Sequence, residues 1–309
     1  MKNADVSSYA SRGEASCREV DKMKAMPGTP ESSKDSVSGM EIQTIDLDGQ
    51  VLRVGVRHGS DASPPLLIFN GIGANIELVE PFVEALGDVS VIIFDIPGVG
   101  GSPAPLVPYR FSTLCVLTEK LLRRLGHDAS VDVLGVSWGG ALAQQFAHLY
   151  PQRCRRLILA ATSPGMIMVP ARLSVLSKLI GPRRYTDRDY LKRVGAEIYG
   201  GVYRREPELL DAHSRHIQAP RGRGYLYQLL AAYGWTSLPW LRTLRQPTLV
   251  MHGNDDPIVP LANAKILAAR IRNATLYVID DGHLFLVARA KEVAPIVRRF
   301  LRQDVASTP

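Results

Sequence analysis

The sequence feature that most directly indicates chemistry is a serine flanked by glycines. Residues 135–139 read Gly-Val-Ser-Trp-Gly, a G-x-S-x-G pattern centred on Ser137. The pattern follows the apolar run Val131–Val136 and leads into a stretch of helical periodicity, Gly140–Leu149. A serine at such a strand–turn–helix junction lies on a tight, strained turn, and small neighbours let its hydroxyl project from the end of the strand. We therefore predict that Ser137 is a nucleophile.

A serine hydroxyl needs a base that takes its proton, and the chain contains seven histidines. His283 comes just after the apolar run Thr275–Ile279. Because the carboxyl ends of parallel strands meet at one edge of a sheet, this position brings His283 toward Ser137. The other histidines lie in helical stretches, at strand ends or in loops: His58, His127, His148, His213, His216 and His252. We predict that His283 is the general base.

The imidazole in turn needs a carboxylate that fixes its tautomer and stabilises its protonated form. The loop Gly253–Pro260 follows the apolar run Thr248–His252 and contains two aspartates. We choose Asp256 as the acid and keep Asp255 as the alternative. Asp255 is otherwise interpreted as a turn residue that hydrogen-bonds nearby backbone.

A tetrahedral intermediate formed at the serine needs two hydrogen-bond donors for its oxyanion. One predicted donor is the backbone N–H of Trp138, the residue after the nucleophile. The other is the N–H of Ile72, in the loop Asn70–Gly73 after the run Leu66–Phe69. Glycines in that loop allow a close approach to the substrate. Loss of one such donor typically costs about 3 kcal/mol of transition-state stabilisation.

The elements that position these residues alternate along the chain. A hairpin is predicted at Glu41–Arg57, around the turn pair Asp48-Gly49. Short apolar runs, typical of parallel strands covered on both faces, follow at Leu66–Phe69, Val89–Phe94, Val131–Val136, Leu157–Ala161, Thr248–His252 and Thr275–Ile279. Helical periodicity lies between them at Glu77–Leu86, Phe111–Leu125, Gly140–Leu149, Leu261–Ile271 and Val293–Leu301. This order predicts an α/β fold with a mostly parallel central sheet flanked by helices.

One long segment interrupts the alternation. Residues 163–240 contain no clear strand, and their helical stretches are separated by glycine and proline. A bare loop of this length is uncommon in a compact domain, so we predict a helical cap at 163–240, inserted into a core formed by 40–162 and 241–304. The cap contains twelve Lys and Arg against six Asp and Glu, and thus holds +6 of the +7 net charge of the chain.

Residues 1–39 differ from the rest in composition. They are rich in Ser, Lys, Glu and Asp and contain no apolar run of the kind that a signal peptide needs. We expect a disordered tail at 1–39. Three cysteines far apart in the chain are typical of free thiols in a reducing compartment, and apolar runs too short to cross a bilayer predict no membrane span. The expected location is the cytoplasm.

Other ligand classes are disfavoured. The glycine-rich stretch Asp95–Ser102 follows a strand, but it has neither a lysine in P-loop spacing nor a G-x-G-x-x-G opening a helix. We interpret it as a tight structural loop and not as a nucleotide site. The cysteines and histidines show no metal-ligand spacing. We expect no metal, no organic cofactor and no nucleic-acid partner.

Together these motifs resemble the α/β-hydrolase superfamily over about residues 41–301, with the triad in the order serine, aspartate, histidine. The stretches Phe69–Val79, Gly135–His148 and Asp280–Leu286, with Pro182–Tyr185 and Gly234–Ser237 in the cap, resemble the intracellular depolymerases of medium-chain-length poly(3-hydroxyalkanoates). That resemblance implies a cap-bearing α/β-hydrolase fold with the triad Ser137, Asp256 and His283. The segment 1–39 departs from the family pattern.

The resemblance also implies hydrolysis of ester bonds in a storage polyester, at the surface of its granules. Apolar residues of the cap would contact polymer and its basic residues an anionic granule coat; the alternative is that the former pack onto the core and the latter are solvated. The apolar residues are Met166, Ile167, Met168, Val169, Leu173, Leu176, Leu179 and Ile180. A soluble esterase or lactonase acting on small acyl esters and a non-catalytic binding protein are the alternative functions. A polyester synthase of similar fold is disfavoured because its nucleophile is cysteine.

Overall fold

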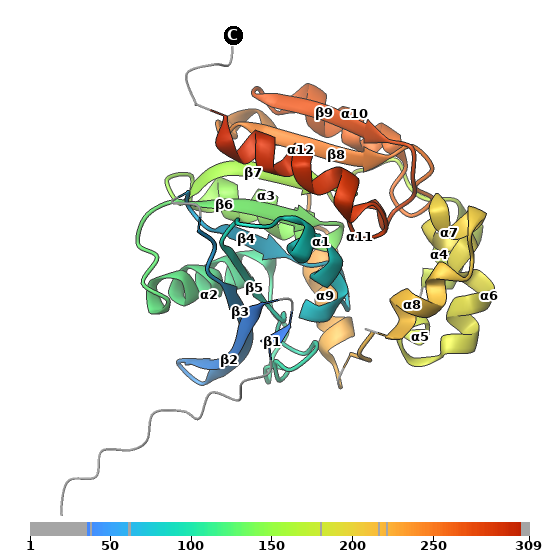
Figure 1. Cartoon of the computed structure of the whole chain (residues 1–309), viewed down its shortest axis with the longest axis horizontal. Coiled ribbons are helices and arrows are strands. Elements are labelled where there is room, and N and C mark those ends of the chain that lie inside the picture. Colours follow the sequence, from blue (N-terminus) through green and yellow to red (C-terminus); the bar gives the residue numbers. More distant parts are fainter. Residues whose placement is uncertain are drawn as a thin grey trace, which may run out of the picture. The chain divides into compact units, whose positions relative to one another are not determined.

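The computed structural model describes residues 36–37, 39–60, 63–179, 181–215, 217–220 and 222–303. Within them, nine strands form one sheet in the order β1-β2-β3-β5-β4-β6-β7-β8-β9 (Figure 1). The strands are β1 (Ser36–Val37), β2 (Met40–Leu47), β3 (Gln50–Arg57), β4 (Leu66–Phe69), β5 (Val91–Phe94), β6 (Val131–Val136), β7 (Cys154–Ala160), β8 (Thr248–Gly253) and β9 (Ala274–Ile279). From β5 to β9 all neighbours are parallel, whereas β1, β2 and β3 pair antiparallel. The predicted mostly parallel sheet is confirmed.

Helices cover both faces of this sheet. They are α1 (Glu80–Ala85), α2 (Phe111–Arg124), α3 (Trp138–Leu149), α10 (Leu261–Arg270), α11 (Phe285–Ala288) and α12 (Ala290–Arg302), with short 3-10 helices η1 (Ile76–Val79) and η2 (Leu241–Thr243). The helix predicted at Glu77–Leu86 is divided into η1 and α1. Pro81 explains the division, because it lacks the N–H that a continuous helix requires and instead suits the first turn of α1.

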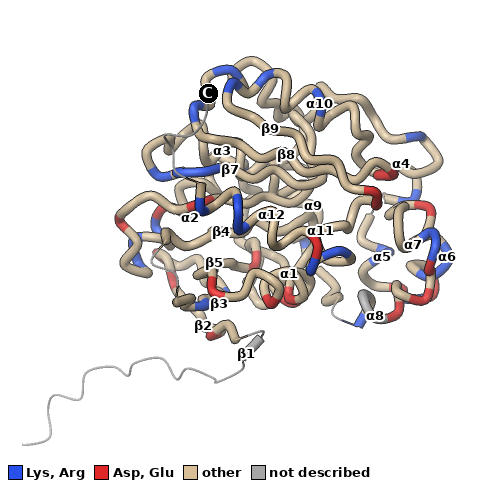
Figure 2. Tube along the Cα trace, turned by 45° about the horizontal axis from the view of Figure 1, so that its top comes forward, with Lys and Arg blue, Asp and Glu red and all other residues tan. Residues whose placement is uncertain are grey.

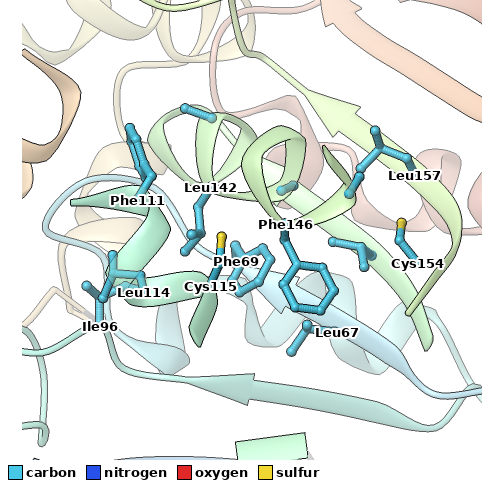
Figure 3. Close-up of a cluster of buried hydrophobic side chains, with 14 of the residues drawn as sticks. Leu67, Phe69, Ile96, Phe111, Leu114, Cys115, Leu142, Phe146, Cys154 and Leu157 are labelled. Carbon is cyan, nitrogen blue, oxygen red and sulfur yellow. The ribbon is translucent and has the colours of Figure 1, made fainter. Parts of the chain in front are cut away.

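The two faces of the sheet have separate apolar cores, since successive strand residues point to opposite sides. In β4, Leu67 and Phe69 face a cluster that includes side chains of α2, α3 and α10 (Figure 3). Leu66 and Ile68 face a second cluster with side chains of α1, α11 and α12. Burial on both faces explains why the central strands are continuous apolar runs.

The amino-terminal strands form the predicted hairpin. Asp48 and Gly49 both have positive φ angles, 55° and 90°, as a tight two-residue turn requires. β1 pairs with the outer side of β2, Val37 opposite Met40. The described chain therefore begins in a strand at Ser36, before the predicted boundary at residue 40, because the free edge of β2 offers backbone partners there. Residues 1–35 and 38, for which we expected a disordered tail, lie outside the described residues.

The segment 163–240 between β7 and β8 folds into helices. They are α4 (Leu173–Leu179), α5 (Arg183–Thr186), α6 (Arg188–Tyr199), α7 (Val202–Arg205), α8 (Leu209–Arg215) and α9 (Gly224–Ala232). Helices α4 to α8 lie together beside the sheet, and α9 lies apart from them (Figure 1). Residues of α4, α6, α7 and α8 form a third apolar cluster. Tyr227 and Ala231 of α9 instead belong to the core cluster beneath the sheet, so the cap is anchored at its carboxyl end.

Charged residues lie mainly on the outer helices and loops, and around α5 to α8 both signs occur side by side (Figure 2). Several basic residues of the cap have acidic partners there, such as Lys178 with Glu197 and Lys192 with Asp211. In the part of the chain that the structure describes, no helix has the length and apolar character needed to cross a membrane.

Candidate active site

Ser137 lies on the predicted turn between β6 and α3. Its backbone adopts φ 53° and ψ −116°, a conformation that non-glycine residues rarely occupy. Glycine is required nearby because the chain is crowded. A Cβ on Gly139 would lie 2.2 Å from the carbonyl oxygen of Phe69, and one on Gly135 would lie 2.4 Å from the carbonyl oxygen of Gly139. The turn therefore brings the start of α3 into close contact with the end of β4.

The structure brings Ser137, His283 and Asp256 together. His283 Nε2 lies 3.1 Å from Ser137 Oγ, and His283 Nδ1 lies 2.7 Å from Asp256 Oδ2. The other carboxylate oxygen of Asp256 accepts hydrogen bonds from the backbone N–H groups of Ile258 and Val259. These bonds fix the carboxylate, which orients the imidazole so that its Nε2 faces the serine hydroxyl.

Asp255, the alternative acid, lies elsewhere. Its Oδ2 accepts a hydrogen bond from the N–H of Gly201, and its Oδ1 forms an ion pair of 2.7 Å with Arg204 Nη1. The side chain is 41% exposed, whereas that of Asp256 is fully buried. Asp255 therefore joins the cap to the loop after β8, and the geometry favours Asp256 as the partner of His283.

Two of the remaining histidines, His252 and His148, contact groups other than Ser137. His252 is fully buried in β8, and its Nε2 lies 2.7 Å from the carbonyl oxygen of Val259. His252 Nε2 also lies 3.4 Å from Asp256 Oδ2. Burial lowers the pKa of His252 although this carboxylate favours its protonated form. His148 stacks on the indole of Trp240 at 4.3 Å. Neither ring has a hydrogen bond to Ser137 among the described residues.

The two predicted oxyanion donors lie beside the nucleophile. Within the described residues, the backbone N–H groups of Ile72 and Trp138 have no hydrogen-bond acceptor. Gly71 approaches Ser137 so closely that a Cβ on Gly71 would lie 3.8 Å from the Cβ of Ser137. The loop after β4 therefore lies against the turn at Ser137. Ile72 in this loop and Trp138 in the turn each keep a backbone N–H without an acceptor among the described residues.

Two cap residues that the sequence analysis missed hold this loop. The hydroxyl of Tyr185 donates to the carbonyl oxygen of Ile72, and the N–H of Gly73 donates to Oε1 of Gln228 at 2.7 Å. Both atoms belong to the single peptide unit that joins Ile72 to Gly73. The carbonyl oxygen of Gln228 also accepts from the indole N–H of Trp138 at 2.8 Å. The cap thereby holds both the loop that contains Ile72 and the side chain of Trp138.

The turn between α6 and α7 holds the two loops that contain Asp256 and His283. The carbonyl oxygen of Tyr199 accepts from the N–H of His283 at 2.8 Å. The N–H groups of Gly201 and Val202 donate to the carboxylates of Asp255 and Asp281. We call residues 199–202 the cap strap. It joins the loops that contain Asp256 and His283, and the only sign of it in the sequence is the glycine pair Gly200-Gly201.

The glycine-rich loop Asp95–Ser102 holds the segment that follows the loop after β4. Buried Asp95 accepts hydrogen bonds from the N–H groups of Ile76 and Gly101 and forms an ion pair of 3.1 Å with Arg53. Arg53 also pairs with Glu77 at 2.6 Å. The loop thus fastens the segment after the oxyanion loop, in agreement with its interpretation as structural.

Ser137 and His283 open into a cavity of about 240 Å³ between the core and the cap. Most of its walls are apolar. The residues that line it include Ile72, Leu78, Val79, Val136, Leu179, Leu229, Ile258, Leu284, Leu286 and Val287, together with Tyr185, Tyr199, Tyr225 and Arg184. A cavity of this kind binds an aliphatic group next to the reacting atoms.

Comparison with known proteins agrees with this geometry. A model of the α/β hydrolase fold family matches residues 64–288. The poly(3-hydroxyalkanoate) depolymerase of Ectopseudomonas oleovorans is 54% identical over 263 residues, which cover 85% of this chain and 93% of that protein. The chain belongs to the α/β-hydrolase family, among its poly(3-hydroxyalkanoate) depolymerases. It is accordingly an enzyme of the carboxylic ester hydrolase class.

More distant members of the family share the fold. The pimeloyl-[acyl-carrier protein] methyl ester esterase of Aromatoleum aromaticum is 29% identical, over 77% of this chain and 98% of its own. The crystal structure of the enol-lactonase from Burkholderia xenovorans LB400 superposes with a TM-score of 0.73 at 22% identity, covering 84% of this chain and all of that chain.

Proposed function

We propose that this enzyme hydrolyses the ester bonds of an intracellular poly(3-hydroxyalkanoate) storage polyester through an acyl-enzyme on Ser137. His283 takes the proton of the serine as Oγ attacks the ester carbonyl. The N–H groups of Ile72 and Trp138 stabilise the oxyanion, and Asp256 stabilises the imidazolium.

His283 then protonates the departing alcohol oxygen, and the ester C–O bond breaks. In the second half of the reaction His283 activates a water molecule, which attacks the acyl-enzyme and releases the acid. The proposed course uses neither a metal nor an organic cofactor.

The observation that carries the proposal is the unbroken line of hydrogen-bonding atoms from Asp256 through His283 to Ser137 at the wall of an apolar cavity. The polyester substrate is supported by the 54% identity to a poly(3-hydroxyalkanoate) depolymerase. The aliphatic lining suits a monomer with an alkyl side chain, since apolar walls hold such a group by its burial.

A second candidate is hydrolysis of small acyl esters or lactones. It is favoured by the likeness to an acyl-carrier-protein methyl ester esterase and by the modest volume of the cavity, about 240 Å³. The same catalytic residues serve both functions, so the substrate distinguishes them.

Contact with a granule is supported by exposed apolar side chains on the cap. Met166, Ile167, Val169 and Leu173 are all exposed, and so is Leu176. Met168 is half-buried and Leu179 lines the cavity, while Ile180 lies outside the described residues. An apolar surface of this extent suits adsorption to a hydrophobic solid.

A second exposed group on the cap was not anticipated. Leu226, Leu230 and Tyr233 lie on or next to α9 and are exposed, close to Leu229 at the cavity wall. They place exposed apolar side chains on the helix that contributes Leu229 to the cavity wall. The proposed location is the cytoplasm, at the granule surface, and the buried free thiols of Cys115 and Cys154 are in keeping with a reducing compartment.

The charged part of the granule hypothesis has less support. Arg204 pairs with Asp255 and Arg205 with Asp280, both on the core, and other cap cations pair within the cap. The charge hypothesis is tested by neutralising cap arginines that have no acidic partner among the described residues, such as Arg188. If these variants adsorb to isolated granules as strongly as the wild type, the basic residues have no part in granule binding. The proposal would then rest on the apolar surface alone.

The test of the function compares emulsified medium-chain-length polyester with p-nitrophenyl esters, for the wild type and for Ser137→Ala. We expect the wild type to release 3-hydroxy acids from the polymer and the variant to have lost both activities. Turnover of p-nitrophenyl esters without release from the polymer would establish the second candidate instead. Activity that persists in Ser137→Ala would refute the mechanism.

A further inference from the structure

A buried arginine faces the cavity that contains the nucleophile. Arg184 lies in the short helix α5 of the cap and is only 5% exposed. Its side chain lines the same cavity as Ser137 and His283. No aspartate or glutamate occurs among the described residues that line this cavity. Arginine keeps its positive charge in proteins. The cavity thus contains a permanent cation within otherwise apolar walls.

The neighbours of Arg184 leave its charge unbalanced. Nη1 donates to the hydroxyl of Tyr225 and the carbonyl oxygen of Leu179, and Nη2 donates to the hydroxyl of Tyr185. The rings of Tyr185 and Tyr225 also lie against the guanidinium, at 4.5 and 5.6 Å. All these partners are neutral. No carboxylate lies within ion-pair distance of Arg184 in the described part of the chain.

Two donors of Arg184 remain for a ligand. Three of its five N–H groups are used, which leaves Nε–H and one hydrogen on Nη2 without an acceptor among the described residues. Nε and Nη2 form one edge of the guanidinium. Elsewhere in this chain, Arg155 uses that edge to hold both carboxylate oxygens of Asp132. In Arg184, Nε and Nη2 each keep one hydrogen without an acceptor among the described residues, and these are the two donors that a carboxylate can use.

Burial makes an anionic ligand favourable here. A buried charge is costly unless it is paired, and the tyrosines compensate Arg184 only in part. An anion that enters the cavity gains a charge-assisted, two-point contact in an environment with little water to weaken it. A neutral ligand of equal size gains no such contact.

We propose that Arg184 binds the terminal carboxylate of the polyester chain, so that the enzyme cleaves the last ester bond at the carboxyl end. This inference rests on the proposed function and adds to it the end of the polymer on which the enzyme acts. In a poly(3-hydroxyalkanoate) the terminal carboxylate is carried by the alcohol part of the last ester bond. Arg184 would hold the leaving group while Ser137 attacks the carbonyl.

The bonds of this step balance without a further reactant. The bond from Ser137 Oγ to the carbonyl carbon forms and the C–O bond to the last unit breaks. The proton passes from the serine through His283 to the alcohol oxygen, and the last unit leaves as a free 3-hydroxy acid. Water then cleaves the acyl-enzyme and leaves a chain that is one unit shorter. That chain again ends in a carboxylate, so it is a substrate for the next round.

The deciding experiment uses two dimers of 3-hydroxyoctanoate, one with a free carboxylate and one whose terminal carboxyl is a methyl ester. The wild type should hydrolyse the inner ester bond of the free acid with a kcat/KM roughly 10- to 100-fold higher, as expected for a charge-assisted pair. An equal or lower kcat/KM for the free acid would overturn the proposal. If neither dimer is hydrolysed, it is the proposed function that fails.

Variants test whether the preference for the free acid over the methyl ester depends on Arg184. In Arg184→Gln the ratio of the two kcat/KM values should fall toward one, whereas Arg184→Lys should retain part of it. The matched control is Arg183→Gln, because Arg183 is the exposed neighbour whose guanidinium pairs with Asp187; its ratio should equal that of the wild type. If Arg184→Gln lowers both values equally and leaves the ratio unchanged, the role of Arg184 is structural and the proposal is wrong.

The wild-type comparison needs no folded variant and so decides the proposal even if Arg184→Gln is unstable. Product analysis gives a second readout. With a purified oligomer of six units, attack at the carboxyl end should release monomer from the first turnovers, together with a chain of five units. Early appearance of dimers, trimers and tetramers in similar amounts would contradict cleavage from the end.

Discussion

The hydroxyl of Tyr185 offers a direct measurement of how far the cap contributes to catalysis. It donates to the carbonyl oxygen of Ile72, while Gln228 accepts from the N–H of Gly73 at the other side of the same peptide unit. Tyr185→Phe removes the first of these bonds, together with the bond that the hydroxyl accepts from Arg184 Nη2, and keeps the ring. The assay substrate, p-nitrophenyl octanoate, has no carboxylate for Arg184 to bind, so it reports on the bond to Ile72. The peptide unit then rotates more freely, and the N–H of Ile72 next to it is less well aimed at the oxyanion.

Two limits bracket the expected effect. Loss of a hydrogen bond costs about 1 kcal/mol net, or roughly fivefold, whereas loss of an entire oxyanion donor costs ~3–4 kcal/mol. The donor is loosened and not removed, so kcat should fall by roughly 5- to 50-fold. KM should change little, because the ground-state ester has no charge on its carbonyl oxygen for the donor to stabilise.

The assay is steady-state hydrolysis of p-nitrophenyl octanoate by Tyr185→Phe, Gln228→Met and the double variant. The double variant should lose less than the product of the two single losses, since both bonds hold one peptide unit. Tyr227→Phe is the control, because its hydroxyl bonds to the carbonyl oxygen of Leu106 outside the site. A wild-type kcat for Tyr185→Phe, or a rise in KM alone, would refute the reasoning.

Two other predictions concern the triad and its buried neighbour. Asp256→Asn should lower kcat roughly ten-thousandfold, because the imidazole loses the carboxylate that orients it, whereas Asp255→Asn should retain most of its kcat; comparable losses would reverse the assignment of the acid. Burial lowers the pKa of His252, so below about pH 6.5 the unfolded chain takes up a proton that the folded chain does not. The contribution of His252 to the free energy of unfolding should be fully present above that pH and decrease below it. In urea titrations, the free energy of unfolding should therefore differ less between pH 7.5 and 5.5 for His252→Asn than for the wild type. An equal difference in both proteins would assign the loss of stability to other groups.

The sequence predicted the fold well where the local pattern and the tertiary environment agree. Apolar runs of four to six residues are typical of strands in a sheet that is buried on both faces, so the central strands were predicted to within three residues at each end. Ser137 was also accessible, because a strand, a serine between glycines and a helix are consecutive in the chain. His283 and Asp256 could be placed because parallel strands end at a common edge.

Residues that act across long separations were not accessible in this way. Tyr185 contacts a residue 113 positions away, and Gln228 contacts one 155 positions away. Neither residue type signals such a role, because tyrosine and glutamine are common on cap helices for packing alone. Arg184 is similar, since only its burial separates it from the exposed Arg183 beside it. The pairing of β1 with β2 was missed because two residues are too few for a periodic pattern.

The cap strap has a consequence for attempts to change the substrate range of this enzyme by exchanging its cap. The backbone of residues 199–202 supplies an acceptor for the N–H of His283 and donors for Asp255 and Asp281. A chimera joined at 163 and 240 would therefore replace part of the scaffolding around its own base. A donor cap can be grafted productively only if its corresponding turn presents the same three backbone groups. Transplanting α4 alone, with α5 and residues 199–202 left in place, varies the cavity wall at Leu179 and keeps the contacts of Tyr185 and of the cap strap.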